Sequence, residues 1–159
     1  MAENIEFSTT QDRKILYREI IPQISSLVKD ETDLIANLAN IAAVLKESFG
    51  FFWVGFYLVK ENQLVLGPFQ GPLACTRIDF GKGVCGNCAE KGETLIVKNV
   101  HEFQGHIACD SRSNSEIVVP VFDSNGKLAA VLDVDSTEIG TFDEDDKIGL
   151  EAICKTLLI

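Results

Sequence analysis

Residues 116–135 read EIVVPVFDSNGKLAAVLDVD, and this stretch predicts two antiparallel strands joined by a tight turn. The segments 116–122 and 127–134 are rich in Val and other apolar residues, a composition that favours strands. Between them, DSNG at 123–126 supplies residues that favour a turn. The sequence therefore predicts a β-hairpin in the second half of the chain.

More strands are expected upstream of this hairpin. The segment 51–60 is rich in aromatic and β-branched residues, and Glu61-Asn62 predicts a turn into a short return strand at 63–67. Other elements expected in this part are strands at 75–80 and 94–97, a short helix at about 84–91, and a long ordered loop at 99–115.

Helices are predicted at both ends of the chain. Apolar residues recur every three or four positions over 11–29, although Pro22 should kink or split that helix. A second helix should run to about residue 48, where Gly50 closes it. A last helix is expected over 143–158, with acidic residues at its start.

This order of elements predicts an α+β fold with a central antiparallel sheet of five or six strands. Residues 1–159 are interpreted as a single domain. Its parts are N-terminal helices at about 11–48, the sheet and the active-site loops at about 51–136, and a C-terminal helix at about 143–158.

Composition narrows the class of protein. The formal net charge of -10 disfavours binding to nucleic acid or to an anionic membrane, because both require clustered Lys and Arg. The longest apolar runs are too short to cross a bilayer, and the first ten residues do not resemble a secretory signal. We therefore expect a cytoplasmic protein.

The five cysteines are an odd number for a structural disulfide set, so most are expected to be thiols. Cys154 lies in a helical pattern and is interpreted as a small buried hydrophobe. Cys75, Cys85 and Cys109 instead lie among strand patterns and Gly turns, which points to redox chemistry at sulfur. One thiolate can attack an electrophilic sulfur, and a second cysteine then removes the oxidised product.

Six short motifs carry a resemblance to a known family. The chain resembles the free methionine-(R)-sulfoxide reductases, which are stand-alone GAF-domain enzymes, from about Tyr17 onward. The spacings of the three cysteines, 10 and 24 residues, match that family as well. The motifs are FWVGFY (52–57), GPFQG (67–71), GVCG (83–86), HIACD (106–110), SNSEIVVP (113–120) and LDVDS (132–136).

The resemblance implies that Cys109 is the nucleophile and that Cys75 or Cys85 resolves its oxidised form. It also implies no bound cofactor, free methionine-(R)-sulfoxide as the substrate and a thioredoxin-type dithiol as the reductant. Cys88 departs from the family pattern and creates a C-x-x-C sequence with Cys85, so a disulfide relay through Cys88 is left open. A homodimer is left open too.

Reduction of a sulfoxide also needs an acid, because oxygen is a poor leaving group unless it is protonated. Asp133 and Asp135 lie two apart on a predicted strand and so share a face, and Glu116 opens the strand that pairs with theirs. If the three carboxyl groups share one pocket, their repulsion leaves a neutral acid at pH 7. Glu116 is predicted to be that acid; a solvated acidic face is the alternative.

The same carboxylates favour a free amino acid as the substrate, because its ammonium would pair with Asp133 and Asp135. Backbone N–H groups at the start of the 84–91 helix could bind the substrate carboxylate. Trp53 and Tyr57 share a strand face and could wall the S-methyl group, with ordinary core packing as the alternative. The predicted substrate-binding residues are Trp53, Tyr57, Val84, Cys85, Ile107, Ala108, Glu116, Asp133 and Asp135.

The sequence leaves two functions as alternatives to the reductase. A GAF module that only binds a small ligand would usually be joined to an output domain, for which this chain has no room. A structural zinc site could draw on Cys75, Cys85, Cys88 and Cys109, with His101 or His106. However, one C-x-x-C pair is present where a zinc ribbon would show two.

Overall fold

The computed structural model describes residues 4–157 and contains one six-stranded antiparallel sheet with strand order β3-β2-β1-β6-β5-β4. The strands are β1 (Trp53–Lys60), β2 (Gln63–Gln70), β3 (Arg77–Asp79), β4 (Leu95–Val97), β5 (Ser115–Phe122) and β6 (Leu128–Ser136). The helices are α1 (Arg13–Val28), α2 (Leu34–Phe49), α3 (Gly83–Lys91), the 3-10 turn η1 (Val100–Glu102) and α4 (Glu144–Cys154).

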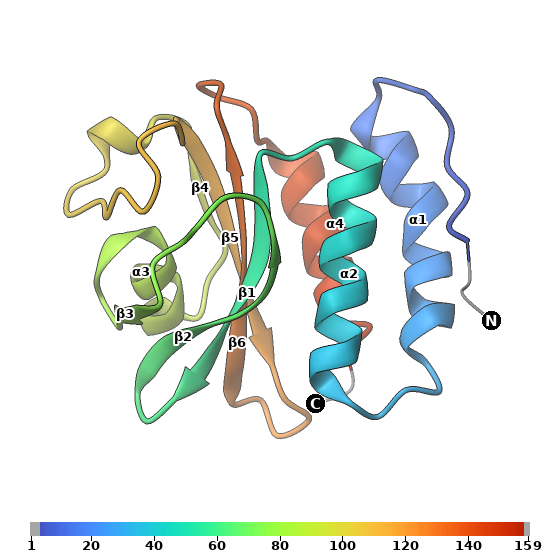
Figure 1. Ribbon diagram of the computed structural model, residues 1–159, viewed down its shortest axis with the longest axis horizontal. Coiled ribbons are helices and arrows are strands. Elements are labelled where there is room, and N and C mark those ends of the chain that lie inside the picture. Colours follow the sequence, from blue (N-terminus) through green and yellow to red (C-terminus); the bar gives the residue numbers. More distant parts are fainter. Residues whose placement is uncertain (1–3, 158–159) are drawn as a thin grey trace.

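The sheet separates two layers. Helices α2 and α4 cover one face with α1 packed outside them, whereas α3 and the loop between β4 and β5 lie on the other (Figure 1). Side chains alternate between the faces, so Val54 and Phe56 join the core beneath the three helices while Trp53 and Tyr57 join the core beside α3. The second layer is the one that forms the site described below.

The predicted α+β class, the central hairpin and the sheet of six strands are confirmed. Gly50 closes α2 as expected, because it adopts the left-handed backbone conformation with φ of 65°. Strand β2 runs to Gln70 rather than ending at residue 67. A bulge places Gly67 and Pro68 opposite Phe56, so the proline is accommodated without interrupting the pairing.

Four further boundaries differ from the sequence prediction. Helix α1 continues through Pro22, because this residue lies on the exposed side of the helix, where water can reach the carbonyl group left without a partner. Strand β1 begins at Trp53, since Phe51 instead stacks on Phe49 in the core. The strand predicted at 75–80 is only Arg77–Asp79. Helix α4 ends at Cys154, and residue 158 lies outside the described residues.

No helix within residues 4–157 is long and apolar enough to span a membrane.

Helices α1 and α4 approach closely at Gly149. A Cβ atom there would lie 2.3–2.6 Å from three ring atoms of Tyr17. The ring is held in place, because its hydroxyl donates a hydrogen bond to the buried Asp146 carboxylate at 3.0 Å. Gly149→Ala should therefore lower the free energy of unfolding by about 1–3 kcal/mol, as overpacking usually does. Urea unfolding measures this, and the exposed Ile148→Ala is the control. An unchanged midpoint for Gly149→Ala would show that the two helices separate without cost.

Candidate active site

A pocket with an empty volume of about 520 Å³ opens on the α3 side of the sheet. Its walls come from β1, the segment before β3 together with β3 itself, the start of α3, the start of β5 and the end of β6. The segment of residues 98–114, called here the 98–114 loop, completes them. Among the residues predicted from the sequence, Trp53, Tyr57, Val84, Cys85, Ile107, Cys109, Glu116, Asp133 and Asp135 line it. The exposed Ala108 and the half-buried Cys75 are not part of this lining.

A disulfide joins Cys75 to Cys109 at the pocket, with 5.3 Å between their Cα atoms. Cys109 lies in the 98–114 loop and is exposed, whereas Cys75 precedes β3 and is half-buried. The sequence had left Cys75 and Cys85 as alternative partners for Cys109, and the structure pairs Cys75. This pairing also argues against the four-cysteine zinc site, because two of its four thiolates are consumed.

Two aromatic residues of β1, Trp53 and Tyr57, hold the segment that carries Cys75. The indole nitrogen of Trp53 donates to the Pro72 carbonyl at 3.1 Å, and the Tyr57 hydroxyl donates to the Cys75 carbonyl at 3.0 Å. Their rings stack with centroids 6.0 Å apart. Both side chains are buried, so each packs in the core and also lines the pocket.

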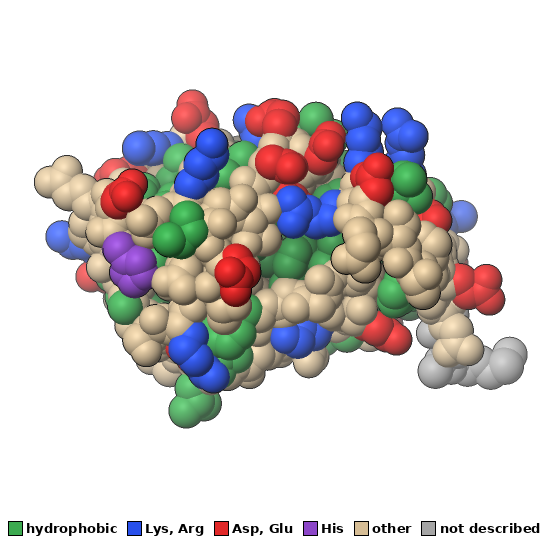
Figure 2. Space-filling view, turned by 90° about the horizontal axis from the view of Figure 1, so that it is seen from above, with side chains coloured by type: hydrophobic (Ala, Val, Ile, Leu, Met, Phe, Trp, Pro, Cys, Tyr) green, Lys and Arg blue, Asp and Glu red, His purple; other side chains and the backbone are tan. Residues whose placement is uncertain are grey.

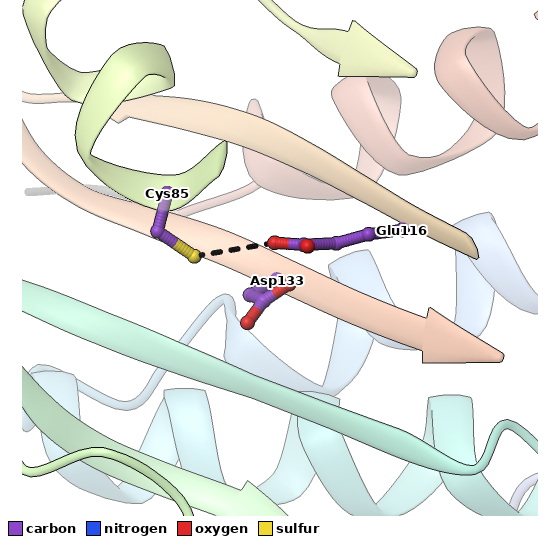
Figure 3. Close-up of side chains that lie close together, drawn as sticks. All are labelled: Cys85, Glu116 and Asp133. Atoms are coloured by element: carbon purple, nitrogen blue, oxygen red, sulfur yellow. Dashed lines mark hydrogen bonds between the residues drawn. The ribbon is translucent and has the colours of Figure 1, made fainter. Parts of the chain in front are cut away.

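Strand pairing brings the acidic residues together. Glu116 lies opposite Asp135 in the β5–β6 register, and Asp133 lies two residues earlier on the same face. Cys85, at the start of α3, points at this group and its Sγ donates to Glu116 Oε1 at 3.7 Å (Figure 3). One atom from each of Cys85, Glu116 and Asp133 lies within 4.8 Å of the others. The predicted proximity of the three carboxyl groups is confirmed.

Burial sets the protonation of this group. Burial raises the pKa of Glu116 well above its usual value, and the charges of Asp133 and Asp135 raise it further. Burial raises the pKa of Asp133 to about 6, and it raises the pKa of Asp135 as well. It also raises the pKa of Cys85, with Asp133 and Glu116 adding to the effect. The pocket thus favours the protonated form of the Glu116 carboxyl, beside a Cys85 thiol that is protonated at neutral pH.

One oxygen atom of this carboxyl cluster lacks a hydrogen-bond partner within residues 4–157. Asp133 Oδ1 is buried and has no hydrogen-bond partner among the described residues. Buried polar atoms are nearly always paired, because an unpaired one costs free energy. The pocket therefore offers an acceptor suited to a cationic or hydrogen-bond-donating ligand.

Comparison with known proteins agrees with this geometry. The family model described as GAF domain matches residues 28–158. A free methionine-R-sulfoxide reductase of Escherichia coli is 44% identical over 142 residues, which are 89% of this chain and 86% of that protein. An X-ray structure of the free methionine-R-sulfoxide reductase of Neisseria meningitidis in complex with its substrate superposes with a TM-score of 0.93 at 57% identity, covering 96% of this chain and 92% of that one.

The chain belongs to the free methionine-R-sulfoxide reductases of the GAF-domain family. The GAF domain-containing protein A of Dictyostelium discoideum is also similar, at 53% identity over 99% of both chains. The reductase names of the relatives disfavour the alternative of a module that only binds a ligand.

Cys88, which departs from the family pattern, lies apart from the reductase pocket. Its side chain is completely buried beneath α3, and its Sγ donates to the Val118 carbonyl at 3.6 Å. Burial raises its pKa to about 12, so it remains a protonated thiol. These contacts favour a packing role over the disulfide relay that the C-x-x-C sequence had left open.

Sequence reasoning missed His106 in the reductase pocket and Arg112 beside it. His106, considered only as a zinc ligand, places its Nε2 3.9 Å from Glu116 Oε2, and burial lowers its pKa. Arg112 pairs with Asp110 at 2.7 Å and stacks over the Phe52 ring at 5.0 Å, which ties the 98–114 loop to the start of β1. These residues lie in an irregular loop or before a strand, where no periodic pattern indicates them.

Proposed function

We propose that this protein reduces free L-methionine-(R)-sulfoxide to methionine, with Cys109 as the nucleophile, Cys75 as the resolving cysteine and Glu116 as the general acid. The observation that supports it most is the Cys75–Cys109 disulfide at a pocket that holds the buried carboxyl groups of Glu116 and Asp133 and the half-buried one of Asp135. The substrates named for the relatives point the same way.

The chemistry proceeds in two steps. The Cys109 thiolate attacks the sulfoxide sulfur while Glu116 delivers a proton to the oxygen. The sulfoxide S–O bond breaks and the hydroxyl group passes to the Cys109 sulfur, so that methionine leaves and Cys109 becomes a sulfenic acid. The Cys75 thiolate then attacks the Cys109 sulfur and displaces the oxygen, which leaves as water after protonation. The product of the second step is the disulfide of this structure.

Substrate recognition follows from the unpaired carboxylate oxygen of Asp133. The substrate ammonium would pair with Asp133 Oδ1 and with Asp135, satisfying the buried oxygen described above. The substrate carboxylate would accept from the backbone N–H groups of Val84 and Cys85 in the first turn of α3. A methionine sulfoxide within a polypeptide has a neutral amide in place of the ammonium, so it would leave the carboxylates without a cation.

Cys85 has a different role in this proposal. Its raised pKa makes it a poor attacking thiol, and its Sγ donates toward Glu116. It therefore helps to orient the acid inside the pocket, and resolution of Cys109 falls to Cys75.

Regeneration needs no bound cofactor. We propose that a thioredoxin-type dithiol reduces the Cys75–Cys109 disulfide and releases both thiols for the next cycle. The thiols at Cys85, Cys88 and Cys154 accord with a reducing compartment, and we propose the cytoplasm as the location. A homodimer stays a prediction.

One assay tests the proposed function. The reduced protein is incubated with dithiothreitol and, separately, with free methionine-(R)-sulfoxide, the (S) epimer and a peptide that carries the sulfoxide. Methionine should form from the free (R) epimer alone. Equal turnover of the peptide would reject the ammonium argument, and no turnover of any substrate would reject the function.

The resolving step gives a separate prediction. Cys75→Ser should complete a first turnover at about the wild-type rate but lose about tenfold or more of its multiple-turnover rate with thioredoxin, because no intramolecular disulfide forms. Cys85→Ser, the matched control, should keep multiple turnover coupled to its first turnover. Rapid-quench measurement of methionine per enzyme distinguishes the two. If Cys85→Ser alone loses recycling, Cys85 is the resolving cysteine.

A further inference from the structure

Leu73 is the most exposed large hydrophobic side chain within residues 4–157, at 87% exposed. It lies two residues before Cys75, at the rim of the pocket. We propose that the apolar rim around the Cys75–Cys109 disulfide, centred on Leu73, is the docking surface for the protein dithiol that reduces this disulfide. This inference rests on the proposed function and adds the surface that its reductant would contact.

The exposure of Leu73 is imposed by its neighbours. The carbonyl of Pro72 accepts from Trp53, and the carbonyl of Cys75 accepts from Tyr57, so both ends of the Leu73-Ala74 pair are anchored to buried side chains of β1. A loop fixed in this way cannot simply fold its leucine inward. Presenting a large apolar side chain to water is unfavourable, and a partner that covers it would recover that free energy.

The other half of the disulfide has a similar surround. Ile107, 39% exposed, and Ala108 directly precede Cys109, just as Leu73 and Ala74 precede Cys75. The charge next to Cys109 is compensated, because Asp110 forms two hydrogen bonds with the Arg112 side chain, at 2.9 and 2.7 Å. Seen from above, hydrophobic side chains emerge among charged and polar ones on both halves of the molecule, including the half that carries α3 (Figure 2).

The disulfide identifies the chemical class of the partner. A thiolate of the reductant attacks one of the two sulfurs, and the other sulfur leaves as a thiolate. The second thiol of the reductant then attacks the resulting mixed disulfide and releases the remaining thiol of this protein. Two electrons thereby move to this protein, and the partner becomes oxidised. A small thiol can reach an exposed sulfur without any surrounding surface, whereas a protein dithiol must rest on the rim around it. An apolar, charge-compensated rim suits a partner whose reactive thiol lies in an apolar surface.

The test measures reduction of the disulfide itself, without any sulfoxide. Oxidised wild-type protein and Leu73→Ser are mixed with reduced thioredoxin or with dithiothreitol, and the second-order rate of disulfide loss is followed. Leu73→Ser should slow reduction by thioredoxin about tenfold, as loss of one central apolar anchor does, and change reduction by dithiothreitol less than about twofold. The control is Ile148→Ser, a 59% exposed isoleucine on α4 at the opposite face of the sheet, which should change neither rate.

Three results would overturn the proposal. Equal rates of thioredoxin reduction for wild type and Leu73→Ser would show that the rim is not contacted. Equal slowing with thioredoxin and dithiothreitol would show that Leu73 acts on the disulfide and not on docking. A dimer that Leu73→Ser converts to a monomer, with thioredoxin reduction unchanged, would assign the rim to a second copy of this chain. A wild-type protein that forms no methionine would reject the proposed function while leaving this comparison readable.

Discussion

Replacing Cys109 by serine should abolish methionine formation while leaving the reduced protein folded. A serine hydroxyl is nearly isosteric with the thiol, but it is far less ionised at neutral pH and cannot form the sulfenic acid on which the cycle depends. Cys109 is exposed in the 98–114 loop, so its replacement leaves no cavity in the core. The measurement is methionine formed with dithiothreitol, together with circular dichroism of both proteins under reducing conditions.

Serine variants at Cys75 and Cys85 serve as matched controls. Cys75→Ser also removes the disulfide, so it separates loss of the nucleophile from loss of the cross-link. It should still complete a first turnover. Near-wild-type activity in Cys109→Ser, combined with an inactive Cys85→Ser, would transfer the nucleophilic role to Cys85 despite its raised pKa.

The carboxyl cluster shows what the sequence can predict. Asp133 and Asp135 share a face because side chains alternate along a strand, and the hairpin turn brings Glu116 opposite Asp135. Both facts depend on local geometry only. The three carboxyl groups could therefore be placed on one face of the sheet before the fold was known, whereas the pocket around them comes from the fold.

The disulfide and the loop residues depend on geometry of a different kind. Cys75 and Cys109 are 34 residues apart in sequence, and their pairing requires the segment before β3 to meet the 98–114 loop across the pocket. No periodic pattern encodes such a meeting. For the same reason His106 could be assigned to a functional loop but not to a place beside Glu116.

Boundaries failed where tertiary contacts overrode local preference. Phe51 has strand propensity, yet stacking on Phe49 directs it into the helical layer. Pro22 lacks an N–H group, yet its exposed position lets α1 continue. In each case the deciding contact comes from the fold or the solvent rather than from the residue itself.

Glu116→Gln should slow the chemical step by about 10²- to 10⁴-fold, which is the usual contribution of a positioned general acid. Glutamine keeps the shape and the hydrogen-bonding reach of the side chain but cannot deliver the proton to the sulfoxide oxygen. Substrate affinity should change less, because the ammonium is assigned to Asp133 and Asp135. Single-turnover rates and dissociation constants for the free sulfoxide measure the two effects separately.

The pH dependence provides a second readout of the same role. Burial, followed by the charges of Asp133 and Asp135, raises the pKa of Glu116, so this carboxyl stays protonated at a pH where an ordinary one is ionised. Because the acid works only when protonated, the wild-type rate should fall as pH rises through that raised pKa. Glu116→Gln has no proton to lose and should lack this fall.

Asp135→Asn is the contrasting variant, since it removes the charge of a side chain assigned to binding and not to proton transfer. It should weaken substrate binding, and so raise the dissociation constant, because part of a charge-assisted contact is removed. The rate at saturating substrate should change less. Glu116→Gln should show the opposite pattern, with a large loss of rate and a smaller change in affinity. If Glu116→Gln loses only affinity and Asp135→Asn loses only rate, acid and anchor are assigned the wrong way round. If the rate of Glu116→Gln still falls with rising pH, the same conclusion follows, because another group would then be delivering the proton.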